Sequence, residues 1–361
     1  MARHPAPHPR RRPALLSAAG GASLMLVALC LSGCEAAQSI FNTSGPAAHR
    51  IAQLSWVMVI LFLVTTGIMW ALIGFAFYRR RGSLEEHQPI DSSGGEGWIA
   101  IGGLGIPFIV LSVLFILGLE LLSEYPINPM HGPENTRAMA QSMKPEILVI
   151  GHQWWWEIHY LSDDPSKEVI TANELHLPVG RPVNIEVATA DVMHSFWIPA
   201  LHGKVDMIPS QKNYIRLEAS KPGEYKGQCA EYCGDEHARM RLLAIAQEPA
   251  QYQQWLDNQR MPGHEPTSPE AVAGKQVFLN SPCALCHEVR GTTAGGRVAP
   301  DLTHIGSRKM IASDLYENND GYLEAWITHA QSLKPDCLMP NITQFSGEQL
   351  QQLVAYLRQL Q

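Results

Sequence analysis

The sequence has no excess of positive charge, and only 17% of its 361 residues are charged. Lysine and arginine number 27, against 34 aspartates and glutamates, which gives a formal net charge of −7. A protein that neutralises nucleic-acid phosphates needs a basic face or stripe, and none is visible in this chain. We therefore expect no nucleic acid among its partners.

Charge is absent altogether from residue 51 to residue 77. A second apolar stretch covers about residues 98–122, and each stretch exceeds the ~20 residues that a helix needs to cross a bilayer. The basic run 79–81 separates them, and short basic loops stay on the cytoplasmic side. We predict a hairpin of two membrane helices, 51–78 and 98–122, in a unit spanning 34–125, with everything after Leu122 outside the cytoplasm. The alternative is that both stretches are buried helices of a protein core, but their length and the lack of charge from residue 51 to residue 77 disfavour it.

The N-terminus has the features of a secretion signal. The basic run 10–12 precedes an apolar segment, 14–31, and then Leu31-Ser32-Gly33-Cys34, which resembles a lipobox. We predict a lipoprotein-type signal peptide over 1–33, with lipid on Cys34. An ordinary signal peptide or a signal anchor is the alternative.

No repeat of fixed period is visible, and the middle of the chain has short Val-, Ile- and aromatic-rich runs punctuated by Pro and Gly. This pattern is typical of a β-sandwich, which we place at 140–250. The expected strands are Ile147–Tyr160, Arg181–Ala190, Asn213–Ala219, Gly223–Gln228 and Arg239–Ala246.

Helical periodicity replaces the strand pattern near the C-terminus. Prolines and a Pro-Gly pair indicate a linker over 251–268, with a short helical piece around Tyr252 to Asn258. Ser268 followed by Pro269 is a helix start, and Ser346 with Gln349 forms a capping-box signature before the last helix. We predict a small all-α domain over 269–361.

Cysteine is scarce: only seven occur, and only four of them lie in close pairs. The first pair belongs to the spacing Cys229-x3-Cys233-x3-His237-x2-Met240. Two thiolates, an imidazole and a thioether are soft ligands that favour copper, and two cysteines on one loop can bridge two ions. A second imidazole is expected from His194, just after a strand. A disulfide between the two cysteines and a zinc site are the alternatives, and the thioether disfavours zinc.

The second pair forms Cys283-x2-Cys286-His287, the attachment signature of a c-type haem. A redox dithiol or half of a zinc site would need a context that the sequence lacks. Met339, before the last helix, is the expected sixth iron ligand, with Met310 as its rival. Cys337 has no assigned role.

Residues 49–247 resemble subunit II of cytochrome c oxidase, on the strength of Asp-Val-Met-His-Ser-Phe (191–196) and Gly-Gln-Cys-Ala-Glu-Tyr-Cys-Gly (227–234). Residues 269–361 resemble a bacterial class I cytochrome c. The resemblance implies a multidomain membrane protein with a cupredoxin-like Greek-key β-sandwich and a cytochrome c domain. It implies electrons entering at Trp154, whereas Trp155 and Trp156 are expected in a core. The implied dinuclear copper ligands are His194, Cys229, Cys233, His237, Met240 and the Glu231 carbonyl, with magnesium on the Glu231 carboxylate.

The resemblance also implies a function. A fused subunit II would take electrons from cytochrome c or another donor through its own haem c and dinuclear copper. It would pass them to oxidase subunit I for oxygen reduction coupled to proton translocation, in a complex that includes subunit III. The expected location is the bacterial inner membrane, with both cofactor domains periplasmic. The family places a proton-path glutamate where Gly95 stands, so the role of Glu96 stays open. The alternatives are a stand-alone copper and haem carrier, or a nitrous oxide reductase, for which no propeller region is present.

Overall fold

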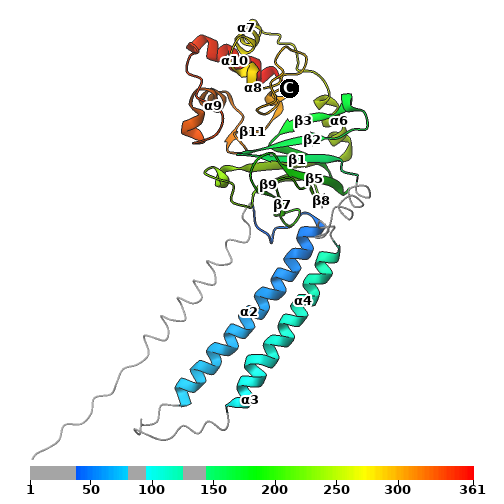
Figure 1. Cartoon of the computed structure of the whole chain (residues 1–361), viewed down its shortest axis with the longest axis vertical. Helices are drawn as coiled ribbons and strands as arrows, with labels where there is room; N and C mark the ends of the chain where they lie inside the picture. Colours follow the sequence, from blue (N-terminus) through cyan, green and yellow to red (C-terminus); the bar gives the residue numbers. More distant parts are fainter. Residues whose placement is uncertain (1–37, 80–94, 125–143) are drawn as a thin grey trace, which may run out of the picture.

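A computed structural model describes residues 38–79, 95–124 and 144–361 of the chain. The predicted signal peptide, Cys34 and the basic run after Arg79 lie outside the described residues. Two long helices extend from one side of a β-sandwich, and a helical C-terminal domain covers its other side (Figure 1). The order along the chain is therefore also the order in space.

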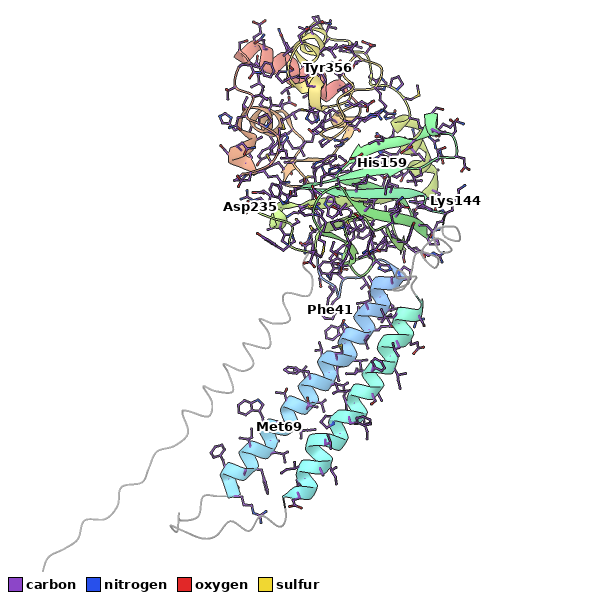
Figure 2. All side chains as sticks on the ribbon, viewed as in Figure 1. Phe41, Met69, Lys144, His159, Asp235 and Tyr356 are labelled. Atoms are coloured by element: carbon purple, nitrogen blue, oxygen red, sulfur yellow. The ribbon has the colours of Figure 1, made fainter. Side chains whose placement is uncertain are left out.

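The two spanning helices differ in regularity. The first, α2, covers Pro46–Arg79 without a break. The second begins as α3 (Glu96–Trp98), continues as a π-helical stretch, η2 (Ile99–Gly105), and becomes α4 (Ile106–Glu124). Both are long and apolar enough to cross a membrane, and their apolar side chains, such as Met69 in Figure 2, are largely exposed. The observed helices contain both predicted spans.

Helix α2 starts earlier than predicted because its first turn is attached to the sandwich. Pro46 stands at the start, where its missing N–H costs no hydrogen bond. Ala47 and Ala48 are buried, and Ala48 N–H donates to Leu201 O at 3.3 Å. Just upstream, Ser44 N–H donates to Ala200 O at 2.7 Å. These contacts fix the orientation of helix α2 relative to the sandwich.

The sandwich consists of two five-stranded sheets with strand orders β3-β2-β1-β5-β8 and β4-β10-β9-β6-β7. The pairings β1–β5 and β4–β10 are parallel and the others antiparallel, so both sheets are mixed. Fully buried side chains such as Trp156, Ile158 and Phe196 fill the space between the sheets. The strands of the first sheet are β1 (Ile147–His152), β2 (Trp155–Tyr160), β3 (Val169–Ala172), β5 (Val183–Thr189) and β8 (Asn213–Leu217). Those of the second are β4 (Glu174–Pro178), β6 (His194–Trp197), β7 (Val205–Met207), β9 (Gly223–Cys229) and β10 (Arg241–Gln247).

Several strand predictions need correction. The run 147–160 is two strands, β1 and β2, which fold back on each other at Gln153 and Trp154. Four strands were not predicted: β3, β4, β6 and β7. Strand β4 is buried at every position because α6 (Pro249–Gln259) packs on it, so it lacks the alternation that marks a half-buried strand. The predicted linker thus begins inside a helix that contacts the sandwich.

The C-terminal domain is built around the crossing of α7 (Pro269–Leu279) and α10 (Gly347–Gln359). At that crossing a Cβ on Gly274 would lie 1.8 Å from Gln352 O, so only glycine permits this approach. The Ser268 cap and the Ser346 capping box are both present, as predicted. The remaining elements are α8 (Cys283–Cys286), η5 (Ile305–Ser307), β11 (Met310–Ile311), β12 (Tyr316–Glu317) and α9 (Asp320–Leu333), besides the short 3-10 turns η3 (Pro165–Lys167) and η4 (His237–Arg239) in the sandwich.

Polar contacts join this helical domain to the sandwich. The buried Glu174 carboxylate accepts hydrogen bonds from the backbone N–H groups of Lys309 at 2.7 Å and Met310 at 2.9 Å. Arg308 donates to Thr171 Oγ1 at 3.2 Å. Further ion pairs across the same interface are Lys226 with Asp314 and Lys309 with Glu224. These contacts hold the two domains together in this structure.

Candidate metal centre and haem pocket

The sulfur and imidazole donors predicted from the sequence converge in one place. Cys229 Sγ lies 3.8 Å from both His194 Nδ1 and Cys233 Sγ. Cys233 Sγ in turn lies 3.6 Å from His237 Nδ1 and 3.9 Å from Met240 Sδ. Both cysteines are free and buried, so the alternative of a disulfide does not hold in this structure. The cluster has the donor chemistry and spacing that soft metal ions require.

His194 is oriented by an acid that sequence reasoning missed. It is the first residue of β6 and not part of a loop, and it pairs with Met207. Asp191 Oδ1 accepts from His194 Nε2 at 2.8 Å, which leaves Nδ1 directed at Cys229. Gly151 packs against the ring, since a Cβ there would lie 2.8 Å from His194 Cδ2. The position of Asp191 three residues before the histidine was the available signal.

The two thiols of the cluster have different protonation behaviour. The hydrogen bond from Cys233 lowers the pKa of Cys229 to about 3, whereas that bond and the adjacent anionic sulfur raise the pKa of Cys233. Two thiolates at this distance repel each other strongly unless a cation lies between them. The pair therefore favours binding of positively charged metal ions.

Glu231 lies inside the loop with its carbonyl toward the cluster. Cys229 Sγ lies 3.1 Å from Glu231 O. This contact places the carbonyl beside the Cys229 sulfur, as expected for the copper ligand that the resemblance to subunit II implies. The Glu231 side chain is half-buried.

Three consecutive tryptophans have three different environments. Trp154 is only 8% exposed, and its Nε1–H donates to Cys233 O at 3.0 Å. Trp156 is fully buried against Phe196, as expected for a core residue. The same expectation was wrong for Trp155, which is half-buried, stacks on His152 and lines the cavity of the helical domain. That domain covers the sheet at this point, which no local pattern reveals.

Two of the three predicted haem-attachment residues, Cys286 and His287, line a largely apolar cavity. Cys283 and Cys286 are the ends of the one-turn helix α8, and His287 follows directly. His287 Nδ1–H donates to Pro300 O at 2.7 Å, which leaves Nε2 free to act as a ligand. Burial lowers the pKa of His287, which keeps the ring neutral as metal ligation requires. Apolar wall residues include Val298, Leu302, Ile311, Leu323, Trp326 and Ile327.

Both candidate sixth ligands line this cavity, so the structure does not separate them. Met339 O accepts a hydrogen bond from Gln331 Nε2 at 2.7 Å. The backbone N–H of Met310 donates to the Glu174 carboxylate at 2.9 Å. Cys337 also lines the cavity, and its Sγ lies 3.3 Å from Gln331 Nε2. Cys337 thus belongs to the hydrogen-bonded loop that carries Met339.

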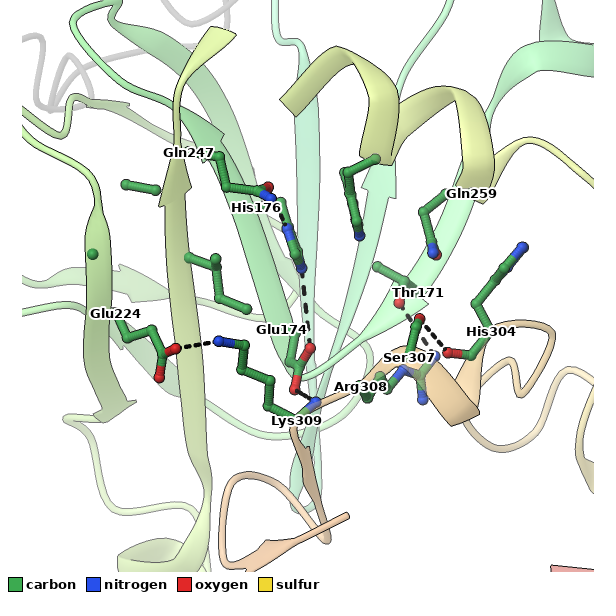
Figure 3. Close-up of a pocket in the computed structure, with 14 residues that line it drawn as sticks. Thr171, Glu174, His176, Glu224, Gln247, Gln259, His304, Ser307, Arg308 and Lys309 are labelled. Atoms are coloured by element: carbon green, nitrogen blue, oxygen red, sulfur yellow. Dashed lines mark hydrogen bonds and ion pairs between the residues drawn. The ribbon is translucent and has the colours of Figure 1, made fainter. Parts of the chain in front are cut away.

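A second cavity of about 430 Å³ lies between the two domains, and none of the predicted ligands lines it (Figure 3). His176 stacks on Trp255 with ring centroids 3.8 Å apart, and burial lowers the pKa of His176 to about 4. Glu174 and Lys309 meet on the wall of this cavity. Its polar residues mainly hold the two domains together.

The fold and the site together define a membrane-anchored protein with a cupredoxin-like domain and a helical cytochrome c domain. Residues 161–247 match the family described as "Cytochrome C oxidase subunit II, periplasmic domain", and residues 271–361 match "Cytochrome c". The two matches fall on the sandwich and on the helical domain, respectively.

Similar proteins cover nearly the whole chain. Cytochrome c oxidase subunit 2 of Alkalihalophilus pseudofirmus is 36% identical over 345 residues, which cover 93% of this chain and 95% of the relative. That of Bacillus sp. strain PS3 is 29% identical, covering 93% and 95%. The crystal structure of the periplasmic domain of subunit II of cytochrome oxidase of Bradyrhizobium japonicum is 29% identical with a TM-score of 0.30, covering 32% of this chain and 91% of that one. The chain belongs to the cytochrome c oxidase subunit 2 family and is a component of such an oxidase.

Proposed function

We propose that this chain is the electron-input subunit of a cytochrome c oxidase. Its haem c domain takes electrons from a cytochrome c or another donor, and its copper domain delivers them to subunit I. Oxygen is reduced there, in a reaction coupled to proton translocation. The complex includes subunit III and lies in the bacterial inner membrane, with both cofactor domains of this chain on the periplasmic side.

For the copper centre, we assign the six donors that meet in the loop. The soft sulfur and imidazole donors and the burial of His194, Cys229, Cys233 and Met240 support this assignment, as does the absence of a disulfide between the two cysteines. The Glu231 carboxylate is assigned to magnesium at the interface with subunit I. The dinuclear copper ligands are His194, Cys229, Cys233, His237, Met240 and the Glu231 main-chain carbonyl.

For haem c, we assign covalent attachment to Cys283 and Cys286, with His287 and Met339 as axial ligands. The apolar cavity beside these residues supports the assignment because it matches the character of a porphyrin face. When bound, the two cofactors supply one-electron carriers, and closed ligand shells keep their geometry constant on oxidation and reduction. The protein's part is to hold, insulate and space them.

The observation that carries this proposal is the position of Trp154. Trp154 lines the haem cavity, its carbonyl accepts from the lining residues Ser313 and Lys334, and its indole N–H donates to the carbonyl of Cys233. The residue expected to receive electrons thus touches both candidate sites. Its neighbour Gln153 also lines this cavity and donates through Nε2 to Cys233 O at 2.8 Å, so this short segment connects the two candidate sites.

Oxygen reduction is assigned to subunit I because the spanning helices offer no ligand set for it. Among their described residues, His49 at the outer end of α2 is the only histidine. A buried oxygen-binding metal site needs several imidazoles within the membrane. The chain therefore depends on a polytopic partner.

Purification in detergent tests the proposal. We expect this chain to copurify with a large polytopic partner, and we expect photoreduced haem c to be reoxidised as the copper pair is reduced. A chain that purifies alone and still carries both cofactors would contradict the oxidase role and indicate a stand-alone carrier.

A further inference from the structure

Lys334 is a buried cation at the contact between the two domains, outside every motif in the sequence. It caps the C-terminal end of α9, just before the loop that carries Met339, and is only 3% exposed. A buried ammonium is stable only when its three N–H bonds find acceptors. The position of this side chain therefore depends on what it contacts.

The three acceptors all lie at the boundary between the haem cavity and the copper loop. Lys334 Nζ donates to Trp154 O at 2.7 Å, to Ser313 Oγ at 3.0 Å and to Arg239 O at 3.3 Å. Ser313 Oγ–H donates to the same Trp154 carbonyl at 2.9 Å. Two donors of the haem domain thus hold one carbonyl of the copper domain.

These bonds continue into the metal loop by two short routes. Trp154 Nε1–H donates to Cys233 O, and Arg239 directly precedes Met240 in the chain. Arg239 also donates to Leu333 O at 3.3 Å, which tightens the same contact. Burial lowers the pKa of Lys334 to about 8, and the nearby buried Glu236 carboxylate, which accepts from Arg239 at 3.2 Å, partly opposes this shift. The contact is polar, closed and adjacent to two proposed copper ligands.

Other interdomain lysines do not reach this loop. Lys309 pairs with Glu224, and Lys226 pairs with Asp314. Lys309 also lines the second cavity (Figure 3), which Trp154 does not line. Lys309 is therefore a matched control, since its loss weakens the interface without removing a donor to Trp154.

We propose that Lys334 is the positioning residue for electron transfer within this chain, holding Trp154 against the haem cavity so that it bridges to Cys233. This inference rests on the proposed function. The step moves one electron from haem to copper and moves no atoms. A residue 180 positions beyond Trp154 in the chain thereby sets the coupling between the two centres.

Lys334→Met in the intact oxidase tests the proposal, because methionine has similar length but no donor. After photoreduction of haem c, we expect electron transfer to copper to slow roughly tenfold or more, as small displacements of reacting groups cost large factors. The haem spectrum and the copper electron paramagnetic resonance signal should be unchanged. Hydrogen exchange should rise in residues 230–240 and 312–316 of the metal-free chain. Lys309→Met should transfer electrons at the wild-type rate.

A milder variant covers the case in which Lys334→Met fails to fold. Ser313→Ala removes only the second donor to Trp154 O and should slow transfer by a smaller factor, with both spectra intact. Wild-type rates in Lys334→Met or, if that variant is not obtained, in Ser313→Ala would overturn the inference, as would equal slowing in Lys309→Met. If haem fails to reduce copper even in the wild-type chain, the proposed function itself fails.

Discussion

The copper loop and the haem cavity gather their proposed ligands in different ways. In the copper loop, residues 229–240 supply all donors but His194, and the sandwich brings their atoms within 4 Å of a neighbouring donor. In the haem cavity, the proposed ligands are spread from residue 283 to residue 339, and two methionines line the wall. The β-sandwich holds the copper donors close together before any metal binds. In the helical domain, two methionines line the cavity, and the position of the bound haem decides which of them ligates the iron. The two regions should therefore respond differently to substitution.

The largest effect is expected from Cys233→Ser, because Cys233 lies beside three of the other donors. Serine offers a hard oxygen that does not bridge copper ions, so the copper-pair resonance should disappear while the haem spectrum persists. Cys337→Ser is the matched control and should keep the copper signal. A copper-pair signal that survives in Cys233→Ser would contradict the assignment.

Met339→Ala should convert haem c from low spin to high spin, because the sixth ligand is lost. Optical and magnetic circular dichroism spectra measure the change. Met310→Ala should keep the low-spin spectrum. The reverse outcome would assign the ligand to Met310 and show that the helical cavity, unlike the copper loop, misleads a sequence-based assignment.

Gly151→Ala tests how rigidly the sandwich holds His194. The new Cβ would meet the imidazole at 2.8 Å, so the ring must leave the position in which its Nδ1 lies 3.8 Å from Cys229 Sγ. We expect copper affinity to fall by about 10- to 100-fold, the usual cost of disturbing a ligand's support. Competition with a chelator measures it. Gly347→Ala is the control and should bind copper with wild-type affinity, because a Cβ there meets nothing within 4 Å. Equal copper affinities in the two variants would show that the sandwich does not hold His194 rigidly.

The smallest effect is expected from His159→Gln, in strand β2 of the same sandwich (Figure 2), where His159 is half-buried between the buried Ile158 and Tyr160. Burial would raise the pKa of Glu157, but hydrogen bonds from His152 and His159 lower it from 4.5 to about 2. Burial would lower the pKa of His159, but its bonds to Glu157 and Glu168 raise it above 6.5. The acid therefore stabilises the fold above pH 4.5 and loses this effect toward pH 2, whereas the histidine stabilises it below pH 6.5 and loses this effect as pH rises through its raised pKa.

Thermal unfolding at several pH values measures this contribution. His159→Gln should lose about 1 kcal/mol of unfolding free energy. The loss should be greatest between pH 4.5 and 6.5 and should fade in alkali. A loss that does not vary with pH would indicate altered packing and not a charge effect.

Local spacing explains which features could be predicted from the sequence. The five proposed donors of residues 229–240 lie within one short segment, so their proximity follows from the spacing alone. The spanning helices and the caps at Ser268 and Ser346 are also local signals. In contrast, the turn at Gln153 and Trp154 is hidden in an aromatic run that reads as one strand. Strand β4 lacks the alternation of apolar and polar residues that marks a half-buried strand, because α6 covers its outer side.

Contacts between distant segments explain what could not be predicted. Trp155 faces a cavity because another domain covers its sheet, and Lys334 is buried because its acceptors come from residues 154, 239 and 313. Neither residue has a neighbouring sequence pattern that reveals its partner. Asp191 is intermediate: its spacing to His194 was visible, but its role depends on β6 starting at the histidine.

Metal analysis combined with electron paramagnetic resonance of the purified, full-length protein tests the central claim most directly. We predict a pair of copper ions in a mixed-valence state together with one low-spin haem iron in each chain. A chain that contains iron but only isolated copper, or no copper, would contradict the assignment of the loop at 229–240.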